Sequence, residues 1–118
     1  MRTNKRHFKQ FCKSFLKYLD FFGVTGWEVL FYHDDPDDED IDAYVRANIQ
    51  NRTILVGLYK EISREDVDFL AFHEAAEVFL YKLRYLADSR YIVKDEIDEE
   101  VHNLIRVLES RFFGGKKR

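Results

Sequence analysis

The stretch FLAFHEAAEVFLY, from Phe69 to Tyr81, places a histidine and two glutamates inside a run that is otherwise apolar. His73, Glu74 and Glu77 are its only strongly polar residues. A segment this apolar predicts a helix that is buried on most of its circumference. A buried charged group needs a partner, so the stretch raises the question of what these three side chains contact.

The composition indicates the number of domains and the cellular location of the protein. With 118 residues, of which 46% are hydrophobic and 16% aromatic, residues 1–118 are expected to form one globular domain. No apolar run reaches the roughly 18 residues of a membrane span, and the N-terminal MRTNKRHFKQ has no signal-peptide core. We therefore expect a cytoplasmic protein without a membrane partner. The lone Cys12 falls on an apolar stripe and is expected to pack as a small core residue.

Outward from the central stretch, the hydrophobic periods predict three helices and three strands. Ser63 and Asp66 form a cap pair that opens the helix containing His73. The alternating pattern of IDAYVRANIQ, with a short step before TILVGLY, predicts a tight hairpin within a three-stranded antiparallel sheet that has one covered face. The predicted elements are a basic helix over 4–22, strands over 27–33, 41–50 and 53–59 (the sheet spanning 27–59), helices over 63–86 and 95–112, and a tail over 113–118. The order α-β-β-β-α-α indicates the α+β class.

Charge is distributed unevenly along the chain. The first predicted helix is basic and has no acid before Asp20, but its lysines lie opposite the apolar stripe, so a solvated face is favoured over a nucleic-acid interface. The run DDPDDED, from Asp34 to Asp40, has six acids in seven residues, yet it lacks the glycine and the distal glutamate of an EF-hand loop. We expect an exposed connector there. His7 and His33, in the basic helix and beside the acidic run, are interpreted as surface residues.

The polar residues of the central helix have the spacing of a metal site. His73 and Glu77 are one helical turn apart, so both side chains can bind one ion. His102, on the last predicted helix, offers a third ligand. If the two helices form an antiparallel hairpin, Glu77 lies about 13 Å before the bend and His102 about 10 Å after it. Two imidazoles and one carboxylate are typical of catalytic zinc with an open position for water.

Glu74 is the predicted general base, because its spacing places it beside the ion rather than on it. Zinc lowers the pKa of bound water to about 7, and a neighbouring carboxylate can take its proton and deliver hydroxide to a carbonyl. The residues therefore predict a hydrolase with zinc as its cofactor.

HEAAE (73–77), followed by DEIDEEVHNLIRVLE (95–109), resembles the phage-encoded metallopeptidases of minimal zincin type, over most of the chain from Trp27 to Glu109. The resemblance implies a minimal zincin-like fold and a zinc peptidase that acts on a peptide or protein substrate in the host cytoplasm. It also implies the ligands His73, Glu77 and His102. The common motif is H-E-x-x-H, whereas a glutamate stands here at the second ligand position. An exchange of His and Glu between the second and third positions keeps two histidines and one carboxylate.

Three alternatives stay open. The polar residues of the central helix can face outward on a purely structural helix. Glu99 and His102 have the Glu-x-x-His spacing of dinuclear carboxylate sites, in which a glutamate of the central helix would bridge a second ion. The acidic run and the basic helix can instead serve a non-enzymatic interaction protein, whose binding would weaken steeply with salt.

Overall fold

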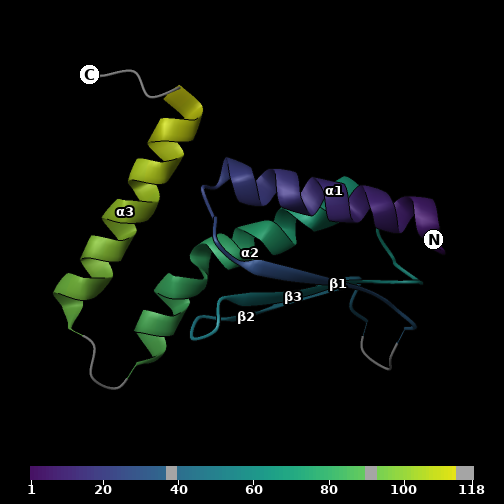
Figure 1. The fold of residues 1–118 in the computed structure, drawn as a ribbon, viewed down its shortest axis with the longest axis horizontal. Coiled ribbons are helices and arrows are strands. Elements are labelled where there is room, and N and C mark those ends of the chain that lie inside the picture. The colour runs from purple at the N-terminus through teal and green to yellow at the C-terminus, as the bar shows by residue number, and fades with distance from the viewer. Residues whose placement is uncertain (37–39, 90–92, 114–118) are drawn as a thin grey trace.

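The structure, a computed structural model, describes residues 1–36, 40–89 and 93–113. It consists of α1 (Lys5–Phe21), β1 (Glu28–Asp34), β2 (Ala43–Asn48), β3 (Thr53–Tyr59), α2 (Val67–Asp88) and α3 (Lys94–Phe113) (Figure 1). The order of elements and the α+β class are those predicted. Parts of the predicted acidic connector and of the predicted tail lie outside the described residues.

Helix α1 begins and ends where local chemistry predicts. The side chain of Asn4 accepts from the backbone N–H of His7 at 3.0 Å, and the His7 ring accepts from the N–H of Asn4 at 3.1 Å. Just past the helix, Gly23 adopts a φ of 73°, a left-handed conformation that ends a helix at low steric cost. Phe15 is fully buried and the lysines are exposed, as predicted. Cys12 is half-buried, and burial raises the pKa of its thiol to about 11, so it stays protonated at neutral pH.

The sheet is mixed, so the prediction that all three strands are antiparallel is wrong. The strand order is β1-β3-β2, with β3 parallel to β1 and antiparallel to β2. The hairpin of β2 and β3 is confirmed. Burial explains the order: β3 carries the fully buried Ile54, Val56 and Leu58, and the central position gives these side chains neighbours on both sides. Strands β1 and β2 have more exposed residues and take the edges.

The turn of the hairpin is longer than predicted. Strand β2 ends at Asn48 and β3 begins at Thr53, so four residues rather than two make the connection. The Asn48 side chain accepts from the N–H of Gln50 at 3.0 Å and of Asn51 at 3.3 Å. Arg52 then takes a φ of 54°. These local hydrogen bonds end the strand two residues before its alternating pattern does.

Helices α1 and α2 pack on one face of the sheet, which confirms the single covered face (Figure 1). The largest fully buried side chains between the layers are Phe11, Phe15, Ile54, Leu58 and Val56. Helix α3 turns back beside the C-terminal half of α2 and reaches the end of α1, where Phe112 packs edge-to-face on Phe21 with ring centroids 5.6 Å apart. None of the helices in the described part of the chain is long and apolar enough to cross a lipid bilayer.

His33 is half-buried beneath the N-terminal segment, which corrects its interpretation as a surface residue. The Phe8 ring stacks on its imidazole with centroids 4.9 Å apart. The Thr3 hydroxyl donates to the carbonyl of Tyr59 at 2.8 Å, so it accepts from the Nε2 N–H of His33, also at 2.8 Å. Burial, and then the charge of Lys60, lower the pKa of His33.

Candidate functional site

Helix α2 is buried along one stripe rather than on most of its circumference, which corrects the prediction from its apolar run. Asp66 caps the helix by accepting from the N–H of Phe69 at 3.0 Å. The buried stripe consists of Val67, Leu70, Ala71, Glu74, Ala75, Val78 and Phe79. Other apolar side chains are exposed, among them Phe72 at 41% and Leu80 at 44%. A three-stranded sheet that is shared with α1 offers too little surface to cover the whole helix.

Glu74 lies on the buried stripe and is only 6% exposed. Its Oε2 atom has no hydrogen-bond partner among the described residues. Burial, and then the nearby charge of Glu77, raise the pKa of Glu74 to about 7. A carboxyl group in this setting either keeps a proton near neutral pH or needs a cation beside it.

His73 and Glu74 line one cavity of about 400 Å³. The cavity is bounded by the start of β2, by the loop before α2 and by the first turns of α2. His73 is exposed. The solvent-exposed imidazole of His73 and the buried carboxyl group of Glu74 therefore line the same cavity.

Asp42 holds one wall of this cavity in place. Its carboxylate accepts from the backbone N–H of Ser63 at 2.8 Å, from the Ser63 hydroxyl at 2.9 Å and from the N–H of Arg64 at 3.1 Å. Burial acts to raise the pKa of Asp42, but these hydrogen bonds outweigh it and hold the pKa below its ordinary value. Ser63 therefore anchors the loop instead of opening the helix, which begins at Val67 rather than at the predicted position 63.

Glu77 lies one turn after His73, on the same side of α2. Its Oε1 atom is 3.5 Å from Nη2 of Arg84. Both side chains of this ion pair are more than a third exposed, so the pair adds little to stability. The Glu77 carboxylate can therefore exchange Arg84 for another cation at little cost. His73 shares a cavity with Glu74, and the charge of Glu77 acts on Glu74. A common site of the three side chains stays a prediction.

The structure places His102 outside this group. On α3 it is Glu100 that is buried, and its Oε1 atom lies 3.3 Å from Nζ of Lys82. This contact joins α2 and α3 near the C-terminal end of α2. The His102 side chain is exposed, as is Glu99 of the dinuclear alternative. Within residues 1–36, 40–89 and 93–113, no three His, Cys, Asp or Glu side chains form a group that could hold an ion. His102 as the third ligand stays a prediction.

The buried partner of Lys82 was missed by the sequence analysis. A signal was present, because Glu100 lies one turn before Leu104 and two turns before Val107, which both pack against the core. A charged residue in such a stripe is expected to have a partner on the facing helix.

Comparison of the chain with protein-family models, with curated proteins and with solved structures gave no match. The proposed function therefore rests on the geometry of the site and on its motif.

Proposed function

We propose that the protein is a zinc-dependent hydrolase that cleaves peptide bonds, with Glu74 as general base and His73, Glu77 and His102 as ligands. One observation carries the proposal: the buried Glu74, with an oxygen that has no partner among the described residues, lines the same cavity as His73. The resemblance of HEAAE and the last helix to minimal zincins supports a peptide as the substrate.

His73 and Glu77 of α2 would supply two donors to a divalent cation, and a third donor has to come from another element. The neighbour that raises the pKa of Glu74 is the like charge of Glu77, and no residue in the described part of the chain donates a hydrogen bond to Glu74 Oε2. An ion held by His73 and Glu77 would offset both carboxylates, and an imidazole with a carboxylate is a donor set that zinc accepts. His102 would add a third donor when α3 presents its imidazole to this pair.

Zinc, when bound, lowers the pKa of a water molecule and polarises a carbonyl group. Proton transfer falls to Glu74. Its carboxylate lies beside the proposed ion, so it can take a proton from the attacking water and hand it to the leaving amine. Its buried position keeps the carboxyl in place for both transfers.

Zinc content and zinc affinity of the purified protein test the ligand set. We expect about one zinc per chain and a large loss of affinity in His73→Ala, Glu77→Ala and His102→Ala. His7→Ala is the matched control, since His7 lies in the capping box at the start of α1, is not among the residues lining the cavity of His73 and Glu74, and should leave zinc binding unchanged. A protein that takes up no zinc from an excess would contradict the proposal, as would wild-type affinity in His73→Ala.

Hydrolysis of a quenched fluorescent protein substrate tests the reaction separately. Glu74→Gln should keep zinc and lower the rate by about 10²-fold to 10⁴-fold, because general-base catalysis is removed while the ligands remain. Chelation should abolish hydrolysis and readdition of zinc should restore it. Stoichiometric zinc without any cleavage would leave the metal site standing and overturn the peptidase assignment.

A further inference from the structure

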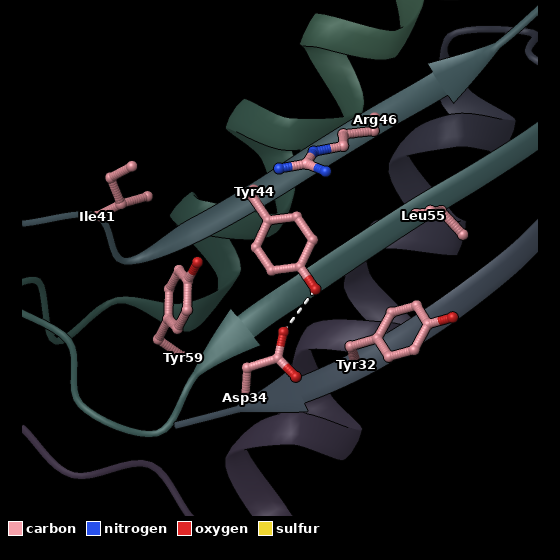
Figure 2. Close-up of a pocket in the computed structure, with 7 residues that line it drawn as sticks. All are labelled: Tyr32, Asp34, Ile41, Tyr44, Arg46, Leu55 and Tyr59. Carbon is pink, nitrogen blue, oxygen red and sulfur yellow. Dashed lines mark hydrogen bonds between the residues drawn. The ribbon is translucent and has the colours of Figure 1, made fainter. Parts of the chain in front are cut away.

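The face of the sheet that the helices leave open carries a second cavity, of about 460 Å³. Its lining includes three tyrosines and two opposite charges, namely Tyr32, Tyr44 and Tyr59 with Asp34 and Arg46 (Figure 2). This volume is in the range of small-molecule sites. The cavity is separate from the one at His73, which lies between β2 and α2.

Gly57 makes room for the Tyr44 ring, which lines this cavity. It pairs across the sheet with Tyr32 of β1 on one side and with Tyr44 of β2 on the other. A Cβ atom at position 57 would lie 2.3 to 2.6 Å from atoms of the Tyr44 side chain. The missing side chain thus allows the Tyr44 ring to lie directly on the backbone of β3.

A hydrogen bond fixes the Tyr44 ring in this position. The Tyr44 hydroxyl crosses β3 and donates to Oδ2 of Asp34 on β1 at 2.6 Å. Burial, and then this contact with Asp34, raise the pKa of Tyr44, so the side chain stays a phenol and keeps donating. The hydrogen bond therefore also fixes the position of the Asp34 carboxylate beside the Tyr44 ring.

The other two tyrosines complete an enclosure around Asp34. The ring of Tyr59 is tilted by 51° against that of Tyr44, with centroids 5.6 Å apart. Figure 2 shows Asp34 between Tyr59 and Tyr32, with Tyr44 facing it. Tyr32 is 42% exposed, so the enclosure is open to solvent.

The charges favour a positive ligand. The faces of aromatic rings carry negative potential, and a carboxylate beside them adds to it. Donation from Tyr44 to Asp34 makes the Tyr44 ring richer in electrons. Arg46 lies beyond Tyr44 on the side away from Asp34, and because its side chain is exposed its charge is screened more than that of the half-buried Asp34.

We propose that the cavity formed by Tyr32, Tyr44, Tyr59 and Asp34 binds an organic cation, a quaternary or alkylated ammonium group carried by a small molecule or by a peptide side chain. The cation lies against the tyrosine rings with Asp34 as its counter-charge. Arg46 opposes binding from the far side of Tyr44. The site is independent of zinc and of the proposed hydrolysis.

Titration of the full chain with choline, followed by NMR, tests the site against a matched neutral ligand. The neutral isostere 3,3-dimethylbutan-1-ol has the same shape without the charge and should bind at least about tenfold more weakly. Equal binding of the two compounds would reduce the site to an apolar hollow and overturn the proposal. The absence of saturable choline binding in the millimolar range would overturn it as well.

Three substitutions give a signature that general unfolding cannot produce. Asp34→Asn keeps the shape and should weaken choline binding several-fold, and Tyr32→Leu should do the same by removing an aromatic face. Arg46→Gln should strengthen binding, because a repelling charge is lost. Tyr85→Leu, at an exposed tyrosine on α2, is the control and should change nothing. The opposite pattern, with AMP binding that is lost in Arg46→Gln, would identify an anion site and contradict the proposal.

The source of the cation is distinguished with peptides. A short peptide containing trimethyllysine is compared with choline and with the same peptide containing unmodified lysine. Preference for the trimethyllysine peptide over choline assigns the site to a peptide side chain. Equal or tighter binding of choline, with weaker binding of the unmodified lysine peptide, assigns it to a small molecule. Equal affinity for choline, the trimethyllysine peptide and the unmodified lysine peptide would show that the site recognises positive charge alone. This result would overturn the role of the tyrosine enclosure.

Discussion

Replacing Glu74 by glutamine should make the metal-free protein more stable at alkaline pH. In the folded protein the pKa of Glu74 is raised from 4.5 to about 7, by burial and then by the charge of Glu77. Between these values the folded state holds a proton that the unfolded state releases, so the free energy of unfolding falls as pH rises. Below about pH 4.5 both states are protonated and the penalty is absent. Glutamine has the same shape but never ionises, so the variant avoids the penalty.

The size of the effect follows from the shift in pKa. A change from 4.5 to about 7, at about 1.4 kcal/mol for each pH unit, corresponds to about 3 kcal/mol once the pH is well above 7. The estimate applies to a side chain that is 6% exposed, so solvent screening reduces it little. The remaining lining of the cavity is the same in both proteins, so the comparison isolates the loss of the Glu74 charge together with its repulsion by Glu77.

Urea denaturation followed by circular dichroism, with a chelator present, measures this difference. We expect the advantage of Glu74→Gln over the parent to grow by about 3 kcal/mol between about pH 4 and about pH 9. Glu65→Gln, at an exposed position in the loop before α2, is the control for the loss of one carboxylate. An advantage that does not change with pH would refute the reasoning. If zinc binds as proposed, it should remove most of the alkaline penalty in the parent, because the cation favours the ionised carboxyl.

Two further substitutions test particular contacts of the fold. Gly57→Ala should destabilise the protein by about 1–3 kcal/mol in urea denaturation, because its methyl group would displace the Tyr44 ring. Combining it with Tyr44→Ala should cost less than the sum of the two changes, and strict additivity would contradict the clash. His33→Gln should change the acid limb of stability. The lowered pKa of His33 contributes stability that is present above its ordinary value of 6.5 and is lost as pH falls through the folded-state pKa. The parent should therefore lose more stability than the variant between about pH 7.5 and pH 5 in thermal melts, and parallel curves would rule out this contribution.

Local patterns predicted most of the elements because the interactions that start and stop them are local. The cap of α1 lies within residues 4 to 7, and the left-handed Gly23 follows the helix directly. The predicted start of α2 failed because of a hydrogen bond to a distant residue. Ser63 has the chemistry of a helix cap but is held by Asp42, so the helix starts at Val67.

The strand order could have been inferred in part. TILVGLY is almost continuously apolar, which is typical of a central strand, whereas the alternation in β2 is typical of an edge. The parallel pairing of β1 with β3 depends on which edge of β3 the first strand takes, and no periodicity within β1 records that choice.

The amino-acid sequence determines which side chains of α2 come together. His73, Glu74 and Glu77 are neighbours in any helix, because they lie within two turns of one another. Which of them is buried, and where His102 lies, depends on how far the sheet and α3 extend over α2. The tyrosine enclosure on the open face likewise joins residues of three strands across a glycine. Only the tertiary structure decides such contacts, because burial and pairing between distant segments arise from the packing of whole layers and not from the pattern within any one of them.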